Sequence, residues 1–187
     1  MRKRIKALSL FSNVGIAETY LNEIGIDVVI ANEINETRAK FYSHLYPEVN
    51  MIVGDITDKK IKEMIIVEGK EKNVDLIMAT PPCQGMSTAG KHDKNDERNM
   101  LIKYAVEIVK KIKPKFAFFE NVPEQLTTNI NYRGKNILIP DYIKSELDEW
   151  YNFNNSHIIN AADYGVPQMR ERAIFLLVRK EQNIIWK

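Results

Sequence analysis

The chain is poor in cysteine, in long apolar runs and in net charge, and each shortage excludes a class of protein. Cys83 is its single cysteine, so an internal disulfide cannot form and a disulfide-stabilised secreted scaffold is excluded. No apolar run reaches membrane-spanning length, and no secretory apolar segment follows the basic first residues. These absences indicate a protein of the reducing cytoplasm, where a free thiol stays reactive.

The formal net charge of +2 is too small to indicate a polyanionic partner. Basic residues gather in the segments MRKRIK and KKIKPK, which we interpret as solvated surface at the approach to a strand. A chain of 187 residues, 44% of them hydrophobic, suits one ordinary core, and no internal repeat is visible. We therefore expect a single domain over residues 1–187.

Short β-rich apolar runs alternate with longer segments of helical period, which is the pattern of an α/β fold. The first pair is a strand over Ile5–Leu10 and an amphipathic helix closed by Gly25, in which Ile16, Tyr20, Leu21 and Ile24 share one face. The next strands are expected at Asp27–Ala31, Met51–Val53, Val74–Ala79 and Phe116–Phe119, and further helices at about 36–46, 99–112 and 142–150.

Two further strands are expected near the end of the sequence, at His157–Ala161 and Ala173–Arg179. A Gly-Val-Pro turn lies between them. We predict that they pair as an antiparallel hairpin at the edge of a mostly parallel central sheet.

The loop after the first strand, Phe11–Gly15, contains one glycine, which does not fit the GxGxxG loop that binds a dinucleotide pyrophosphate. Glu33 and Asp55 end the second and third strands, at the edge where open α/β sheets bind ligands. Glu33 can accept hydrogen bonds from ribose hydroxyls, and Asp55 can accept one from an adenine amino group. Adenosine without pyrophosphate suggests S-adenosylmethionine. Either residue alone is more often a helix-start residue or a turn former.

The segment ATPPCQG places Cys83 directly after two prolines, which stiffen the backbone before the thiol. In an arbitrary sequence, a lone cysteine is more often a small buried hydrophobe. Cys83 follows a strand instead of lying within it, which favours exposure at the ligand-binding edge and a role as nucleophile.

Glu120 ends the next apolar strand, and we predict that it shares a site with Cys83. The segment QMRER alternates, so Arg170 and Arg172 point to the same side when the chain is extended. Two guanidinium groups could hold a base carbonyl or a phosphate. The ordinary alternatives are a solvated glutamate and an edge strand protected by charge.

In this order, the segments FSNVGIAE, ANEI, GDIT, PPCQ, ENV and QMRER resemble the successive signature motifs of the cytosine-C5 DNA methyltransferases. The resemblance covers nearly the whole chain. It implies a Rossmann-like S-adenosylmethionine-dependent methyltransferase fold and methyl transfer to C5 of a cytosine in DNA. It implies no metal ligands. The base must leave the duplex, because neither a thiol nor a sulfonium methyl group reaches ring atoms inside a base stack.

The resemblance also implies roles for single residues. The cofactor would be bound by Phe11 on the adenine ring, Gly15 through close approach, Glu33 at the ribose, Ile34 and Pro82 as flanking groups, and Asp55 at the adenine amino group. Cys83 would add to C6 of the cytosine while Glu120 holds and protonates N3, and Arg172 with Arg170 would bind the base. Gln84, Ser87 and Val122 would contact the substrate, and residues 84–91 would move over the DNA.

The sequence departs from the family in two places. Asn13 and Ile16 stand where glycines are usual, and the target-recognition domain and C-terminal motif are absent. We therefore expect one subunit of a split methyltransferase or a truncated form, acting on DNA together with a second polypeptide that carries the absent parts. Two alternatives stay open: a tRNA cytosine-C5 methyltransferase, and a non-catalytic adenosine-binding regulatory subunit.

Overall fold

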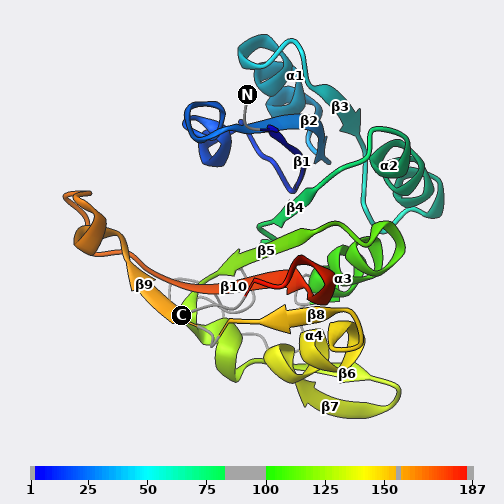
Figure 1. Cartoon of the computed structure of the whole chain (residues 1–187), viewed down its shortest axis with the longest axis vertical. Helices are drawn as coiled ribbons and strands as arrows, with labels where there is room; N and C mark the ends of the chain where they lie inside the picture. The colour runs from blue at the N-terminus through cyan, green and yellow to red at the C-terminus, as the bar shows by residue number, and fades with distance from the viewer. Residues whose placement is uncertain (1–2, 83–99, 155–156, 185–187) are drawn as a thin grey trace.

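The computed structural model describes residues 3–82, 100–154 and 157–184. Within them, eight strands form one sheet in the order β3-β2-β1-β4-β5-β10-β8, with β9 also paired to β10 (Figure 1). The strands are β1 (Ile5–Leu10), β2 (Ile26–Glu33), β3 (Asn50–Val53), β4 (Leu76–Ala79), β5 (Phe116–Asn121), β8 (Tyr151–Phe153), β9 (His157–Asn160) and β10 (Glu171–Arg179). Strands β1 to β5 pair in parallel, and β10 is antiparallel to its three partners. The predicted α/β fold is confirmed.

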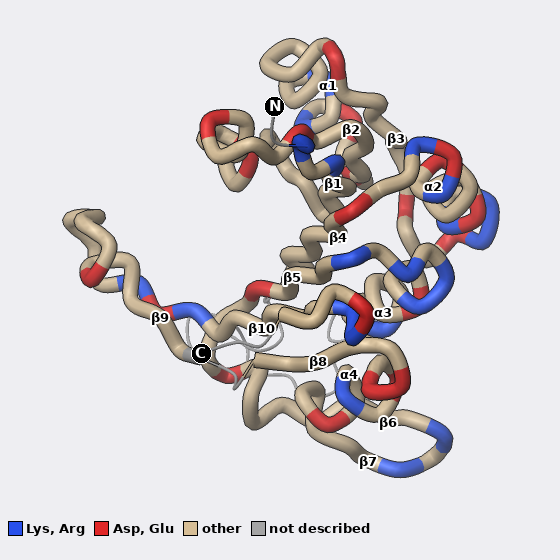
Figure 2. Tube along the Cα trace, in the orientation of Figure 1, with Lys and Arg blue, Asp and Glu red and all other residues tan. Residues whose placement is uncertain are grey.

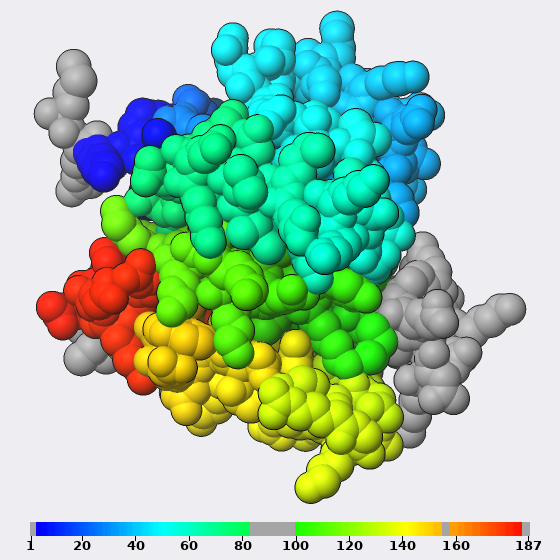
Figure 3. Space-filling view, turned by 90° about the vertical axis from the view of Figure 1, so that its right-hand side faces the viewer, coloured from blue at the N-terminus to red at the C-terminus, as the bar shows by residue number. Residues whose placement is uncertain are grey.

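Three helices, α2 (Lys59–Glu71), α3 (Leu101–Ile112) and α4 (Ile139–Leu147), lie on one side of the sheet (Figure 1). The space-filling view toward this side shows their residues next to one another (Figure 3). The main core lies between these helices and the sheet, where Ile65, Ile108 and Ile143 pack near Leu8 and Phe119. None of the helices in the described residues is both long and apolar enough to cross a membrane.

The short helix α1 (Glu36–Leu45) packs on β2 and β3, and its buried Ala39 and Tyr42 do not belong to the main core. It begins as predicted at Asn35, whose side-chain oxygen accepts a hydrogen bond from the Arg38 amide. Asn35 thereby fixes the chain direction directly after the end of β2.

The predicted amphipathic helix after β1 is wrong. The segment forms two short 3-10 helices, η1 (Ile16–Glu18) and η2 (Asn22–Ile24), and Gly25 ends the second in the left-handed conformation. The side chains of Ile16, Tyr20 and Ile24 are 79%, 70% and 71% exposed. An apolar stripe stabilises a helix mainly when another element covers it, and none of the described residues covers these three.

The predicted C-terminal hairpin is confirmed, with β10 as its inner strand and β9 as its outer strand at the sheet edge. Strand β10 pairs with β5 on one side and with β8 and β9 on the other. Strand β8 was not predicted, and it begins directly after residues 142–150, which were predicted to form a helix. The helix α4 begins earlier, with Pro140 in its first turn, and ends at Leu147.

Several elements were not predicted from the sequence. They are α2, β6 (Asn129–Tyr132), β7 (Lys135–Leu138), η4 (Pro123–Thr127), η5 (Ala161–Tyr164) and η6 (Lys180–Gln182). Strands β6 and β7 form a separate hairpin, and η5 lies at the turn of the β9–β10 arm, which projects from the body of the molecule (Figure 1).

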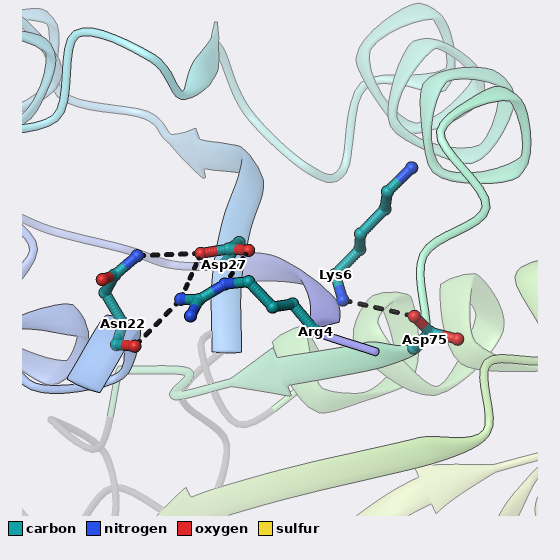
Figure 4. A network of polar contacts seen from close by, with 5 residues as sticks. All are labelled: Arg4, Lys6, Asn22, Asp27 and Asp75. Atoms are coloured by element: carbon teal, nitrogen blue, oxygen red, sulfur yellow. Dashed lines mark hydrogen bonds and ion pairs between the residues drawn. The ribbon is translucent and has the colours of Figure 1, made fainter. Parts of the chain in front are cut away.

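A polar network fixes β1 to its neighbours at the amino end of the sheet (Figure 4). Arg4 donates to both carboxylate oxygens of Asp27, at 2.6 and 2.7 Å, and to the Asn22 carbonyl at 2.9 Å. The backbone amide of Lys6 donates to Asp75 at 3.2 Å, and Asp75 also pairs with Lys115 at 2.6 Å. These contacts hold the end of the sheet opposite to the candidate site.

Candidate active site

The carboxyl ends of β1 to β4 border a cleft of about 620 Å³, which we call the edge cleft. Five of the predicted cofactor-binding residues line it: Phe11, Glu33, Ile34, Asp55 and Pro82. The structure therefore brings together side chains from four loops that are far apart in the sequence.

Glu33 is 5% exposed, and both of its carboxylate oxygens face backbone amides. One oxygen accepts a hydrogen bond from the Asn13 amide and the other from the Asn35 amide, each at 2.9 Å. These bonds orient the carboxylate and link the first loop to the start of α1. Each oxygen retains a second lone pair with which to accept a ligand hydroxyl.

Asp55 follows β3 and is exposed in the edge cleft. One of its carboxylate oxygens accepts a hydrogen bond from the Thr57 amide at 2.8 Å. The neighbouring buried Asn32 donates to the carbonyls of Ile52 and Gly54 at 2.9 and 3.1 Å. Asn32 thus fixes the end of β3 relative to β2, and with it the backbone directly before Asp55.

The loop between β1 and η1 contains three residues in the left-handed region: Phe11 at φ 60°, Asn13 at φ 53° and Gly15 at φ 84°. Asparagine adopts this conformation more readily than most residues. Asn13 therefore adopts the left-handed conformation at a position where the family usually has glycine. Ile16 has no positive φ, so this backbone needs no glycine there.

Gly15 does not line the edge cleft but packs against α1 and the residue that follows it. A Cβ atom at this position would lie 2.3 Å from the ring of Tyr46, whose hydroxyl donates to the Gly15 carbonyl at 2.8 Å. The structure thus gives Gly15 a packing role, and its predicted role toward the cofactor stays a prediction.

Glu120 and Arg172 form an ion pair across β5 and β10, with Arg172 Nε 2.8 Å from Glu120 Oε1. Their side chains are 25% and 19% exposed. Both residues, with Arg170, line a second cleft of about 840 Å³, which we call the sheet cleft. Phe11, Asn13 and Thr80 line both clefts, so the sheet cleft adjoins the edge cleft.

Asn121 connects β5 to the segment that carries the predicted nucleophile. Its side-chain nitrogen donates to the Pro81 carbonyl at 3.1 Å, and its oxygen accepts a hydrogen bond from the Val122 amide at 2.8 Å. Asn121 is 3% exposed, so both bonds are shielded from water. This contact holds Pro81 beside the strand end that carries Glu120.

A third cleft, of about 400 Å³, contains Val122 together with Arg170 and Arg172. Arg170 and Arg172 thus line both the sheet cleft and this third cleft, and their predicted role toward the base stays a prediction. The amide of Arg170 donates to the Asn160 side chain at 3.1 Å, and its own side chain is exposed.

Three predicted site residues, Cys83, Gln84 and Ser87, lie outside the described residues. Sequence analysis also missed several residues that line the edge cleft: Asn13, Asn32, Arg38, Gly54, Ile56, Thr57, Thr80 and Leu101. Asn32 and Thr80 could have been found, since each lies at the end of a predicted strand next to a predicted site residue or segment. Arg38 and Leu101 come from helices, and their approach to the cleft depends on helix packing.

The family model of the C-5 cytosine-specific DNA methylases matches residues 5–186. The chain belongs to this family. Among the curated methylases, it is 41% identical to the Type II methyltransferase M1.HgaI of Avibacterium volantium, over 100% of this chain and 53% of that protein. It is 31% identical to M.AquIA of a Picosynechococcus species, over 91% of this chain and 71% of that protein.

Solved methylase structures have the same fold. A putative DNA modification methyltransferase encoded within an E. coli prophage aligns with a TM-score of 0.78 at 26% identity, covering 98% of this chain and 49% of that one. The Spodoptera frugiperda DNMT2 structure aligns with a TM-score of 0.75 at 24% identity, covering 98% of this chain and 52% of that one, which shows the fold alone. The chain spans about half the length of most of the curated methylases it matches.

Proposed function

We propose that this chain is the catalytic and cofactor-binding part of a DNA cytosine-C5 methyltransferase. The observation that carries the proposal is the ion pair of Glu120 and Arg172 at 2.8 Å, which lines the sheet cleft, a cleft that shares lining residues with the edge cleft. A base held at this pair would lie next to a ligand in the edge cleft. Two ligands in adjacent clefts are what a group transfer requires.

The residues of the edge cleft fit S-adenosylmethionine. Glu33 and Asp55 are acceptors suited to ribose hydroxyls and an adenine amino group, and Phe11, Ile34 and Pro82 offer apolar contact to the adenine. Arg38 is the one cation among the described lining residues, and the first loop has one glycine. The cleft therefore offers few groups that could bind a pyrophosphate. When bound, S-adenosylmethionine supplies an electrophilic methyl group.

The chain's own residues would activate the cytosine. The Cys83 thiolate forms a bond to C6 of the extruded base while the Glu120 carboxyl group gives its proton to N3, which leaves C5 electron-rich. After methyl transfer, loss of the C5 proton to a base returns an electron pair to the ring. The C5–C6 double bond re-forms, the thiolate leaves C6, and the N3 proton returns to Glu120.

Other side chains would hold the base during these steps. Arg172 would orient Glu120 and, with Arg170, bind the base, while Gln84, Ser87 and Val122 contact the substrate. The bond from Asn121 to Pro81 supports this arrangement, because it holds the residues just before Cys83 beside the strand that carries Glu120. Gly15 would bring the first loop close to the cofactor.

We propose that DNA recognition requires a complementary polypeptide. The relatives are about twice as long as this chain, which leaves room in them for a target-recognition part. DNA is favoured over tRNA, because the matching family and the curated relatives are DNA methyltransferases. A non-catalytic adenosine-binding role is not favoured either, because Asn13 preserves the left-handed backbone at a position where the family usually has glycine.

The experiment measures methyl transfer from labelled S-adenosylmethionine to cytosine-containing DNA and to tRNA. This chain is produced together with the part of M1.HgaI that it does not match, and the pair is compared with the chain alone. The pair should methylate DNA, and Cys83→Ser and Glu120→Gln should abolish the transfer. Glu63→Gln, an exposed position on α2, is the matched control and should change little.

DNA that carries 5-fluorocytosine tests the covalent step, because fluorine at C5 cannot leave as a proton and the adduct persists. The adduct should form with the unmodified pair and be absent in Cys83→Ser. Efficient methylation of tRNA in place of DNA, or an adduct that survives Cys83→Ser, would contradict the proposal.

A further inference from the structure

Two basic segments that the proposed mechanism does not use come together in the structure. MRKRIK leads into β1, and KKIKPK joins the end of α3 to β5. Both contribute residues to a cleft of about 400 Å³ at the amino end of the sheet, which we call the basic cleft. Figure 2 shows Lys and Arg at the start of β1 and in the turn from α3 to β5. Segments far apart in the sequence thus concentrate positive charge in one place.

Positive charge dominates the lining of the basic cleft. Among the described residues, seven Lys and Arg side chains line it, against one carboxylate, Asp75. The cations are Lys3, Arg4, Lys6, Lys70, Lys113, Lys115 and Arg179. The whole chain has a formal net charge of only +2, so this excess is local. A surface that carries charge of one sign attracts ligands of the opposite sign.

Carboxylates neutralise some of these cations. Three pairs form: Lys115 with Asp75 at 2.6 Å, Arg4 with Asp27 at 2.6 Å, and Arg179 with Glu181. The other four cations are exposed and form no ion pair with a described residue: Lys3, Lys6, Lys70 and Lys113. In Figure 4 the Lys6 side chain extends away from the Asp75 carboxylate, and its ammonium group donates to the Lys72 carbonyl at 3.1 Å.

Lysines near the C-terminal ends of helices ordinarily balance the helix dipoles. Helices α2 and α3 both end at the basic cleft, to which they bring Lys70 and Lys113. Each helix end is equivalent to roughly half a negative charge, so the two ends balance about one of the four unpaired lysines and leave about three positive charges. Repulsion among these charges costs stability, which indicates a ligand that relieves it.

We propose that the basic cleft binds the phosphate backbone of a DNA segment outside the site of methylation. The lining crosses the sheet from β1 over β4 and β5 to β10, which are neighbours in that order. At an inter-strand spacing of about 4.8 Å, this row is about 14 Å long. Successive phosphates of one DNA strand advance about 3.4 Å along the helix axis, so the row can face about four of them. A single phosphate would leave most of the cations unused.

The basic cleft is separate from the clefts of the candidate active site. Strand β1 runs from one to the other, and its six residues place the edge cleft about 20 Å away, at about 3.3 Å per residue. Lysine contacts to phosphates carry no sequence information, so binding here would keep the protein on DNA without selecting a sequence. The choice of DNA among polyanions rests on the proposed function, in which DNA is the substrate.

The test measures binding of the full chain to a fluorescent duplex of poly(dA) and poly(dT), which contains no cytosine. Lys3→Gln combined with Lys70→Gln removes two exposed cations whose side chains make no hydrogen bond with a described residue. This double variant should bind roughly tenfold more weakly at low salt. The slope of log affinity against log salt concentration should become shallower by about two. Lys3→Arg combined with Lys70→Arg keeps the charge and should retain binding.

Lys135→Gln combined with Lys144→Gln is the matched control. It removes the same charge at exposed positions outside the basic cleft and should change the affinity and the salt slope little. Circular dichroism checks that each variant is folded, and Lys6→Gln gives the deciding comparison if the first double variant is not.

Equal binding by the Lys3 and Lys70 double variant and by the control would overturn the inference. So would competition by polyglutamate that is as effective as competition by DNA of equal charge, because the cleft would then suit an acidic protein segment. Binding to this duplex needs no methyl transfer. A chain that binds it as expected but methylates no DNA with the complementary polypeptide would therefore contradict the proposed function and leave this inference standing.

Discussion

Glu18 is a buried carboxyl group that the proposed mechanism does not use. It is 4% exposed and accepts a hydrogen bond from the Ser9 hydroxyl on β1. Its second oxygen and the hydroxyl of the nearby buried Tyr42 have no partner among the described residues. Burial raises the pKa of Glu18 above its ordinary value of 4.5, although the Ser9 hydrogen bond acts in the opposite direction. Folding therefore shifts the equilibrium of this carboxyl group toward its protonated form relative to the unfolded chain.

Glu18→Gln should change the dependence of stability on pH. Between the unfolded and the raised folded pKa, the folded protein binds more protons than the unfolded chain, so the free energy of unfolding falls as the pH rises. The loss is about 1.4 kcal/mol per pH unit within that window. Urea unfolding from pH 4 to pH 8 should therefore show Glu18→Gln gaining stability relative to the unmodified protein. Glu23→Gln, at an exposed position in η2, is the control, and parallel curves for all three proteins would contradict the expectation.

Arg172→Lys tests the geometry of the ion pair with Glu120. The Arg172 guanidinium contacts the Glu120 carboxylate at 2.8 Å and donates to the Glu171 carbonyl at 2.6 Å, a combination that an ammonium group cannot reproduce. Single-turnover methyl transfer by the complemented pair should slow by roughly tenfold or more. Arg179→Lys, at the other end of β10, should leave the rate unchanged. A normal rate for Arg172→Lys would mean that the Arg172 guanidinium has no role in the reaction.

At the scale of elements, the first loop depends on its left-handed residues. Gly15→Ala would place a Cβ atom 2.3 Å from the Tyr46 ring, in a backbone conformation with φ 84°. Gly25→Ala has a similar φ of 87°, but no described atom lies within 4 Å of the added Cβ. Chemical denaturation should show a loss of about 1 kcal/mol for Gly25→Ala and of about 3 kcal/mol or more for Gly15→Ala. Equal losses would mean that the Tyr46 contact is relieved at little cost.

The elements that sequence analysis predicted are those whose pattern is local. The strand Ile5–Leu10 and the helix capped by Asn35 agree with the structure, because an apolar run and a capping side chain need no distant partner. The segment 16–25 has a good helical period and nevertheless forms two 3-10 helices. An apolar stripe stabilises an α-helix mainly where another element of the protein packs on it. Strand β8 has three residues and is defined by its pairing with β10, which no local signal reveals.

At the scale of the whole molecule, the order of the strands turned separate sequence segments into one site. Sequence analysis placed Glu33, Asp55 and Glu120 at strand ends, and parallel strands bring such ends to one edge. It could not supply the pairing of Arg172 with Glu120, which follows from the register of β10 on β5. Nor could it supply the bond from Asn121 to Pro81, which joins segments forty residues apart.

The apolar side chains that line the sheet cleft, among them Phe116, Phe118, Ile174 and Leu176, lead to a prediction about the isolated chain in solution. A folded protein with a large contiguous apolar surface binds hydrophobic dyes such as anilinonaphthalene sulfonate. The isolated chain should enhance the fluorescence of this dye while keeping the near-ultraviolet circular dichroism of a packed core. Absence of enhancement in the folded chain would indicate that these side chains are not accessible to the dye.

The apolar lining of the sheet cleft, which none of the helices α2, α3 and α4 covers among the described residues, has a consequence for how such a protein is produced in a cell. A folded chain that leaves apolar strands in contact with water is exposed to aggregation and proteolysis. If it acts with the second polypeptide proposed above, its abundance should follow that of the second polypeptide, with surplus molecules degraded, so that balanced synthesis of the two would set how much enzyme accumulates.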